Sequence, residues 1–209
     1  MNLAANQEPV PVVAHTTVAL QLVALRVRSG RLELLHRPRA EDSALPVVVP
    51  RGHDEISATA TARAHELVGC SGRSLQLEVR GRPADGLVAA YVHLVRPGHP
   101  RQPAPSPAAG WSWRDHRRIP LEPADRELVD RAIAFVAGQL DLGEVAFALV
   151  GEEFTVSELR SVHEAMLQVS LDPSNFRKRV CRLVKDGEVE ELARRRPTAT
   201  RPARLYRRL

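Results

Sequence analysis

The first half of the chain carries short apolar runs separated by turn residues, a pattern typical of β-strands. Thr16–Val27 is rich in leucine and β-branched residues, and the turn signal Arg28–Arg31 separates it from a second run, Leu32–Arg37. Two such runs around a Ser-Gly turn predict a β-hairpin. The same pattern predicts further strands at Val47–Val49, Ser74–Val79 and Leu87–Val95.

A helical segment interrupts these predicted strands. Asp54–Val68 contains alanine and glutamate, lacks proline and glycine, and is followed directly by Gly69. Glycine is the preferred residue just beyond a helix because it adopts the left-handed conformation without steric cost. The sequence therefore predicts one helix that ends at Gly69.

The clearest break in the chain is a proline-rich segment. Five prolines fall between Pro97 and Gly110, a composition typical of a linker or an extended surface loop. The chain is therefore divided into a flexible arm at 1–13, an N-terminal domain at 14–97, a linker at 98–118 and a C-terminal domain at 119–209.

Beyond the linker the hydrophobic period becomes helical. A stripe from Leu128 to Leu140 follows Pro123, and Thr155 with Glu158 forms a capping box that opens a second helix. Asp172 and Pro173 are a strong start signal for a third helix, because aspartate caps the free N–H groups and proline fits the first turn. Val189–Leu192 and Arg204–Leu209 are then predicted to pair as a two-stranded ribbon.

Charge changes the interpretation of this C-terminal region. Residues 172–209 hold 12 Lys and Arg against 5 Asp and Glu, a balance of +7, whereas the whole chain carries +5. The part of the chain before Asp172 therefore sums to −2, so the basic charge is local. Localised positive charge on a patterned segment is the electrostatic signature of a surface that binds a phosphate backbone.

The cysteine count and the lack of long apolar runs argue against disulfide-rich, zinc-binding, secreted and membrane proteins. Cys70 and Cys181 are too few for a disulfide framework or a zinc site, and no cofactor is predicted. The N-terminus lacks the pattern of a signal peptide, and the chain has no run of about 18 uncharged apolar residues. We therefore expect a cytoplasmic protein that does not bind membranes.

The predicted C-terminal elements are two helices, a tight turn, a third helix and a two-stranded ribbon. This is the order of a winged helix-turn-helix, in which the helix after the turn enters the major groove of DNA. At about 100° per residue, Phe176 and Val180 define the buried face of the third helix. The donors opposite and beside that face, together with the arginines of the ribbon, are predicted to contact DNA bases and phosphates. These residues are Ser174, Asn175, Arg177, Lys178, Arg179, Arg182, Lys185, Arg194, Arg195, Arg196, Arg201 and Arg204.

RNA binding is the alternative within the nucleic-acid class. Recognition of single-stranded RNA usually uses exposed aromatic side chains, and Phe176 and Tyr206 are better explained as core residues. Double-stranded DNA is therefore the predicted partner.

The C-terminal segments Phe154–Leu167, Leu171–Val180 and Arg201–Tyr206 resemble the Nudix-related transcriptional regulators of NAD metabolism, the NrtR family. The resemblance runs from about Thr16 to Tyr206 and is specific in the C-terminal third. It implies an α+β fold, with an N-terminal Nudix-like α/β/α sandwich around a mixed sheet and a C-terminal winged helix-turn-helix. It also implies a homodimer that binds a palindromic operator and responds to a metabolite of the ADP-ribose type.

The Nudix box of that family is degenerate here. In the box, a helix carries several carboxylates that hold Mg²⁺ against a diphosphate. Alignment backward from Gly69 places Arg63 and Leu67 in two of the three carboxylate slots and Glu66 in the remaining one. Val47 and Val48 stand where the loop glycines would be, so hydrolysis by the Nudix route is not expected and the protein is predicted not to be an enzyme. The resemblance suggests Arg37, Arg51 and Glu66 as the ligand set.

The leading hypothesis is a homodimeric transcriptional regulator, a repressor, whose catalytically inactive Nudix-like domain senses a nucleotide-type effector. The alternative is an active Nudix-type pyrophosphohydrolase with an appended nucleic-acid-binding domain. A third hypothesis is a scaffold whose N-terminal domain binds no small molecule and only dimerises. Turnover of ADP-ribose would distinguish the hydrolase from the regulator. DNA binding without thermal stabilisation by any nucleotide would favour the scaffold.

Overall fold

The computed structural model describes residues 18–50, 55–70, 72–82, 86–97, 106–140, 143–198 and 201–209. The predicted arm 1–13 and the candidate ligand residue Arg51 lie outside these residues. None of the helices in the described parts of the chain is long and apolar enough to cross a membrane.

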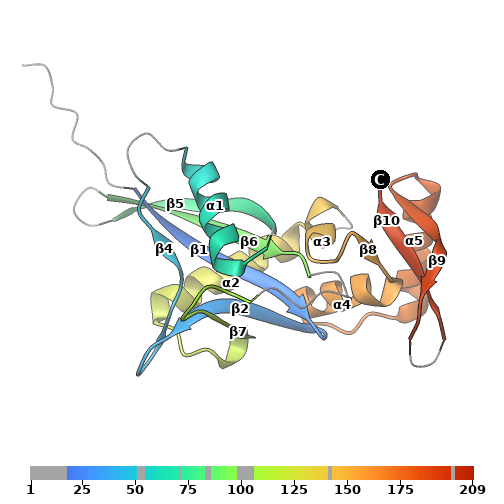
Figure 1. The fold of residues 1–209 in the computed structure, drawn as a ribbon, viewed down its shortest axis with the longest axis horizontal. Coiled ribbons are helices and arrows are strands. Elements are labelled where there is room, and N and C mark those ends of the chain that lie inside the picture. The colour runs from blue at the N-terminus through green and yellow to red at the C-terminus, as the bar shows by residue number, and fades with distance from the viewer. Residues whose placement is uncertain are drawn as a thin grey trace, which may run out of the picture.

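A mixed sheet organises the N-terminal half (Figure 1). In the described residues its order is β3-β2-β1-β6-β5, with β4 paired to β1 and β7 to β2. β1 and β6 are parallel and the remaining pairs are antiparallel. The strands are β1 (Val18–Arg28), β2 (Arg31–Pro38), β3 (Ser43–Ala44), β4 (Val47–Val48), β5 (Gly72–Arg82), β6 (Gly86–Val95) and β7 (Ser112–Asp115).

The predicted hairpin is confirmed. β1 and β2 pair up to the register Arg28↔Arg31, which leaves Ser29 and Gly30 as the two turn residues. Both have positive φ, 50° and 72°, as a tight hairpin turn with the twist of the flanking strands requires.

Helices cover both faces of the sheet. α1 (Ile56–Val68) buries Ala60, Ala64, Leu67 and Val68 against one face, and it ends as predicted at Gly69, whose φ is 71°. The spacing of those four residues follows one side of a helix, which explains why α1 lies flat on the sheet. α2 (Pro123–Gly138) buries the predicted stripe against the other face. The predicted α/β/α sandwich with a mixed sheet is therefore confirmed.

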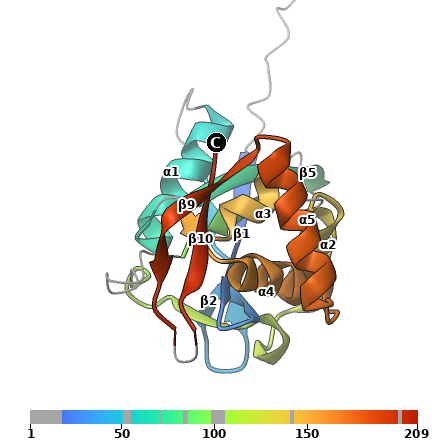
Figure 2. The ribbon, with the colours of Figure 1, turned by 90° about the vertical axis from the view of Figure 1, so that its right-hand side faces the viewer.

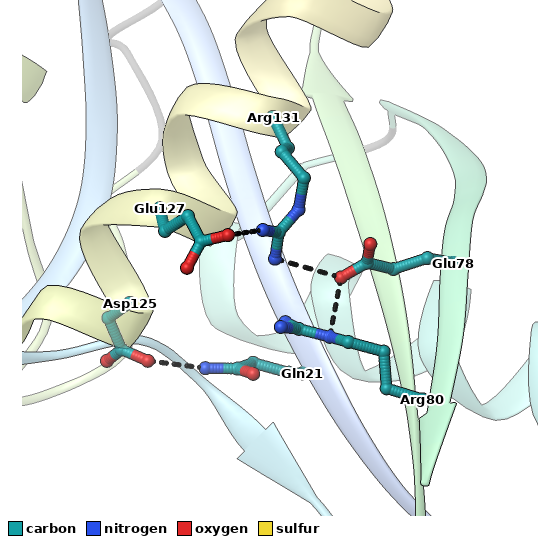
Figure 3. Close-up of polar contacts among 6 residues, drawn as sticks. All are labelled: Gln21, Glu78, Arg80, Asp125, Glu127 and Arg131. Carbon is teal, nitrogen blue, oxygen red and sulfur yellow. Dashed lines mark hydrogen bonds and ion pairs between the residues drawn. The ribbon is translucent and has the colours of Figure 1, made fainter.

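Polar contacts fix α2 on the sheet (Figure 3). Arg131 lies 3.1 Å from Glu78 of β5, and Glu78 also accepts a 2.7 Å contact from Arg80. Near the start of α2, the Gln21 amide donates to the Asp125 carboxylate at 2.7 Å. These contacts tie α2 to the N-terminal sheet, whereas the sequence placed it with the C-terminal domain.

The predicted linker at 98–118 also differs from the structure. Its end forms β7, which pairs with β2 in the register Glu33↔Asp115, followed by the 3-10 turn η1 (His116–Arg118). Before β7, the Ala108 N–H donates to the Leu67 carbonyl at the end of α1. The proline-rich composition ends at Pro107, and a strand as short as β7 does not show a clear period. From Ala108 on, this segment is therefore part of the N-terminal structure.

The C-terminal half is a winged helix. Its elements are α3 (Glu144–Ala148), β8 (Glu153–Phe154), α4 (Val156–Leu167), α5 (Pro173–Lys185), β9 (Val189–Arg196) and β10 (Ala203–Arg208). The sequence missed α3 and β8, which are both very short. In the described residues, β8, β10 and β9 form a three-stranded sheet in that order. Figure 2 shows α5 and the β9–β10 ribbon on the outer end of the molecule.

One hydrophobic core connects the two halves. Leu25 and Leu34 of the sheet belong to the same buried cluster as Leu128 of α2, Leu159 of α4 and Phe176 of α5. A continuous core limits independent motion, because separating the halves would expose apolar surface. The winged helix is therefore seated directly on the sheet and not held at the end of a free linker.

Candidate nucleic-acid interface

The start of α5 is set by its N-terminal residues. The Asp172 carboxylate accepts a hydrogen bond of 2.8 Å from the Asn175 N–H, and Pro173 occupies the first turn. The side chain thus satisfies a backbone donor that the helix itself cannot. The predicted start is confirmed, and it fixes which side chains of α5 face outward.

Burial along α5 follows one face. Phe176, Val180 and Leu183 are buried in the shared core, as the sequence predicted. The opposite face and its flanks carry the predicted polar and cationic side chains, all of them exposed. They are Ser174, Asn175, Arg177, Lys178, Arg179, Arg182 and Lys185.

A shallow hollow runs along this exposed face. Its lining includes Ser174, Lys178 and Lys185, and also Cys181, which is not among the residues predicted to contact DNA. At about 100° per residue, positions 174, 178, 181 and 185 form one stripe, so the spacing alone pointed to Cys181. A small, weakly polar thiol therefore lies at the centre of the surface that would face a DNA groove.

The turn between α4 and α5 is fixed by side chains of α4. The predicted capping box is present: the Glu158 N–H donates to Thr155 Oγ1 at 3.2 Å, and the Thr155 N–H donates to Glu158 Oε2 at 2.8 Å. At the other end, Glu164 accepts from the Leu171 N–H at 2.9 Å, and Arg160 donates to the Leu171 carbonyl at 3.3 Å. These bonds hold the segment that leads into α5, and so the direction of the helix.

The β9–β10 ribbon is longer than predicted. It pairs from Ala203↔Arg196 to Arg208↔Val189, with an irregularity between Arg204 and Tyr206. Tyr206 and Leu205 are buried, which confirms the assignment of Tyr206 to the core. The segment 194–196, predicted as part of the loop, is therefore part of strand β9.

Several ribbon arginines already have carboxylate partners. Arg194 pairs with Glu153, Arg196 pairs with Glu158, and Arg204 approaches both oxygens of Glu191 at 2.7 and 2.9 Å. The hydrogen bond that Arg204 donates to Glu191 also raises the pKa of Arg204. These three arginines would have to exchange a carboxylate for a phosphate on binding DNA.

Arg195 and Arg201 differ from those three ribbon arginines. Both are exposed, and among the described residues neither guanidinium has an ion pair. The Arg201 backbone is held instead, since its N–H donates to Thr198 Oγ1 at 3.3 Å. Within the ribbon, these two positions offer positive charge that no carboxylate of the described chain neutralises.

The candidate ligand residues of the N-terminal domain lie on separate elements. Arg37 is exposed on β2 with its guanidinium 5.3 Å from the centre of the Trp111 ring, and Glu66 is exposed on α1. The segment that carries Trp111 also bonds to the end of α1 through Ala108. No contact joins Arg37 to Glu66 in the described structure, so a shared ligand site stays a prediction.

The Nudix-type metal site does not fit these residues. Arg63 and Glu66 form an ion pair of 2.6 Å on the outer side of α1, so the single remaining carboxylate is bound to a cation. Leu67, in another carboxylate slot, is 3% exposed and packs in the core. Val48 is part of β4 and pairs with Leu20, in place of a flexible glycine loop. Mg²⁺ prefers several oxygen ligands in one cluster, which this helix does not offer.

The fold and its exposed basic helix together define a class: a Nudix-like α/β/α domain joined to a winged helix of the DNA-binding type. A family model described as the NrtR DNA-binding winged helix domain matches residues 146–208. The resemblance to the NrtR regulators is thereby confirmed, and the C-terminal segment belongs to this domain family.

Solved structures with the same fold cover nearly the whole chain. NrtR of Shewanella oneidensis, solved in complex with a 27mer DNA, is 19% identical with a TM-score of 0.73, over 92% of this chain and 93% of that one. A MutT/nudix family protein of Enterococcus faecalis is 17% identical with a TM-score of 0.69, over 94% and 89%. The search of curated proteins found no match. At these identities the structural comparisons show the fold.

Proposed function

We propose that the protein is a DNA-binding transcriptional regulator, a repressor, that reads DNA with α5 and the β9–β10 ribbon. The observation that carries the proposal is the division of α5 into one buried apolar face and one exposed face of donors and cations. Such a helix meets both requirements of major-groove binding, attachment to a core and outward hydrogen-bond donors. The DNA-binding unit of this proposal is residues 143–209, since α2 lies on the sheet.

The proposed partner is a palindromic operator bound by a homodimer inside the cell. A single α5 reads only a few base pairs, whereas two copies related by a twofold axis read two half-sites one helical turn apart. The resemblance to the NrtR regulators supports this arrangement. The Arg195 and Arg201 side chains would add phosphate or minor-groove contacts beside each half-site.

The N-terminal domain is proposed to sense a nucleotide-type metabolite such as ADP-ribose, with a role linked to NAD metabolism. The Nudix-like fold and the family of the winged helix support this part of the proposal. A ligand that binds one arrangement of the dimer more tightly would change the spacing of the two α5 helices and hence the affinity for DNA. Arg37, Arg51 and Glu66 remain the proposed ligand residues.

The same proposal assigns no hydrolase activity to the protein. The Arg63–Glu66 ion pair and the buried Leu67 support this, because they leave α1 without a cluster of free carboxylates. Incubation of ADP-ribose with Mg²⁺ and the full chain should give no turnover above background. Turnover that disappears in Glu66→Gln would instead establish the pyrophosphohydrolase.

DNA binding is tested by gel shift and fluorescence anisotropy on the DNA upstream of the coding gene. The full chain should bind one palindromic fragment at least 100-fold more tightly than a scrambled fragment of equal length, and affinity should fall steeply with salt. Lys178→Ala and Arg182→Ala should each weaken specific binding by about tenfold. Arg63→Ala on α1 is the matched control and should change nothing.

Equal affinity for the scrambled fragment would refute the operator part of the proposal. The oligomeric state is measured separately by sedimentation of the chain with and without DNA. A stoichiometry of one chain per palindrome would refute the homodimer.

A further inference from the structure

A charged cleft lies where the two halves of the molecule meet. It has a volume of about 490 Å³ and is lined by the start of β5, the end of β6, the α3–β8 region and the end of β10. In Figure 1, α3 and β8 lie between the sheet and the end of the molecule formed by α5, β9 and β10. The cleft is therefore bordered by both domains.

Arginines dominate the charge of the cleft. Its lining contains four arginines and two glutamates, a net charge of +2 among these six side chains, and one of the four, Arg207, also pairs with Glu190 of β9 outside the lining. The arginines come from different parts of the chain, and each can present a planar fork of donors to an anion. The six residues are Arg73, Arg96, Arg207, Arg208, Glu144 and Glu152.

Glu144 bridges the two halves of the molecule inside the cleft. Its Oε2 accepts from Arg73 of β5 and its Oε1 accepts from Arg208 of β10 at 3.2 Å. The hydrogen bonds from Arg73 and Arg208 lower the pKa of Glu144. One carboxylate thus satisfies two guanidinium groups that the fold brings together, one from the N-terminal sheet and one from the last strand of the chain.

These ion pairs are exposed enough to exchange. Arg73 and Arg208 are each 42% exposed, and Glu144 is 53% exposed. Pairs with such exposure contribute little to stability, because water competes for both charges. Arg96 pairs with Glu152, itself 80% exposed, at 3.2 Å. An anion with more charge than a carboxylate would therefore displace Glu144 at small cost.

We infer that this cleft binds a diphosphate group, with the Glu144 carboxylate occupying the place of one phosphate in the ligand-free chain. Arg73 and Arg208 both donate to the one Glu144 carboxylate, and the oxygens of a phosphate group match the donor forks of these two arginines. Arg208 also lies 5.6 Å from the centre of the Phe147 ring, which gives the cleft an apolar wall beside its charges. The diphosphate is either inorganic pyrophosphate or that of a nucleoside diphosphate.

The two sources are distinguished by equilibrium dialysis of the full chain against radiolabelled pyrophosphate, with EDTA present to remove divalent cations. Unlabelled ADP is then added as a competitor. Displacement at lower concentration than unlabelled pyrophosphate identifies a nucleotide, which uses the apolar wall. Equal or weaker displacement identifies the diphosphate group alone.

Substitutions in the lining of the cleft test whether pyrophosphate binds there. Arg73→Gln and Arg208→Gln should each weaken pyrophosphate binding at least tenfold. Arg80→Gln, at an arginine of similar exposure (41%) that pairs with Glu78 on β5, should leave it unchanged. Glu144→Gln should tighten binding several-fold, because it removes the competing charge. A gain of affinity cannot arise from misfolding, so this variant keeps the test valid if an arginine variant is unstable.

Absence of pyrophosphate and ADP binding by the unaltered chain would overturn the inference, as would equal affinity in the Arg73→Gln and Arg208→Gln variants. Weaker binding in Glu144→Gln would also overturn it. The experiment contains no DNA, so its outcome is independent of the DNA-binding part of the proposed function, and the Arg73 and Arg208 variants distinguish this cleft from the proposed effector site at Arg37, Arg51 and Glu66. A chain that binds DNA but no diphosphate, or the reverse, separates the two proposals.

Discussion

The ring of His163 lies edge-on against the ring of Phe176, with 5.0 Å between the ring centroids. His163 belongs to α4 and Phe176 to α5, so this contact joins the two helices of the helix-turn-helix. The His163 ring is 2% exposed, and its two nitrogens lie 2.9 Å from the Leu159 carbonyl and 3.1 Å from the Leu140 carbonyl. The buried ring thus connects three segments around the base of α5.

Replacement of His163 by alanine should destabilise the protein. The change leaves a cavity beside Phe176 and removes the hydrogen bond that the ring donates to a buried carbonyl, so we expect the free energy of unfolding to fall by about 3 kcal/mol. Urea unfolding followed by circular dichroism measures this. His163→Phe, which keeps a ring without the nitrogens, should lie between the two. A loss below about 0.5 kcal/mol in His163→Ala would show that the contact is dispensable.

Chemical modification should locate the DNA on α5. Cys181 is exposed in the hollow of α5, whereas Cys70 is half-buried and burial raises the pKa of its thiol. N-ethylmaleimide should therefore label Cys181 faster in the free chain. Bound operator should slow labelling of Cys181 at least tenfold and leave Cys70 unchanged, as measured by mass spectrometry of the peptides. Equal protection of both cysteines would point to a global effect and not to contact with α5.

Release of a ribbon arginine should strengthen DNA binding. Glu191→Gln removes the carboxylate that holds Arg204, so Arg204 would meet a phosphate without first leaving an ion pair. We expect a several-fold lower Kd at low salt and a steeper dependence of log K on log salt, by about one unit of slope. Glu127→Gln on α2 removes a carboxylate that pairs with Arg131 and is the control. Identical slopes in the two variants would exclude Arg204 from the interface.

Stability should fall in mild acid because of a buried histidine. Burial, assisted by the neighbouring His65, lowers the pKa of His93 from 6.5 to about 4. An unfolded chain therefore binds a proton below pH 6.5 that the folded chain does not accept until about pH 4. The free energy of unfolding is therefore highest at pH values above 6.5. It decreases as the pH falls, by about 2 kcal/mol at pH 5. His36 and His116, whose pKa values burial also lowers, act in the same direction.

Urea unfolding at pH 7.5 and pH 5.0 measures the acid effect. His93→Asn keeps a polar atom near Ser74, whose Oγ lies 2.9 Å from His93 Nδ1. The variant should be less stable at pH 7.5, but its difference between the two pH values should be smaller by about 2 kcal/mol. An unchanged difference would mean that His93 does not titrate on unfolding.

The elements that the sequence predicted well are those defined by signals a few residues apart. The Asp172–Pro173 start of α5, the Thr155–Glu158 capping box and the Gly69 end of α1 each depend on local backbone groups. Local hydrogen bonds of this kind need no knowledge of the rest of the fold. The outward face of α5 followed from the same logic, because one helical period fixes it once the start is known.

The features that the sequence did not predict depend on partners far along the chain. β7 is a strand only because β2, which lies much earlier in the sequence, offers it an edge. Arg204 is held by Glu191 of the neighbouring strand β9, and Arg194 by Glu153 of β8, which lies beyond β10 in the sheet, so no spacing in the sequence reveals these partners. The seat of α2 on the sheet likewise depends on Glu78, a residue with no local relation to Arg131. Long-range pairing of this kind also explains why the sequence did not place β7 and α2 on the N-terminal sheet.

The continuous core beneath α4 bears on how such a protein can be rebuilt or can evolve. Leu159, Val162 and Met166 pack into the same cluster as the sheet residues Leu25 and Val27. A DNA-binding half cut out at the proline-rich segment would expose this apolar face to water and invite aggregation. Exchange of DNA specificity between relatives is therefore expected to proceed through substitutions on the outer stripe of α5, while the two halves are inherited together as one unit.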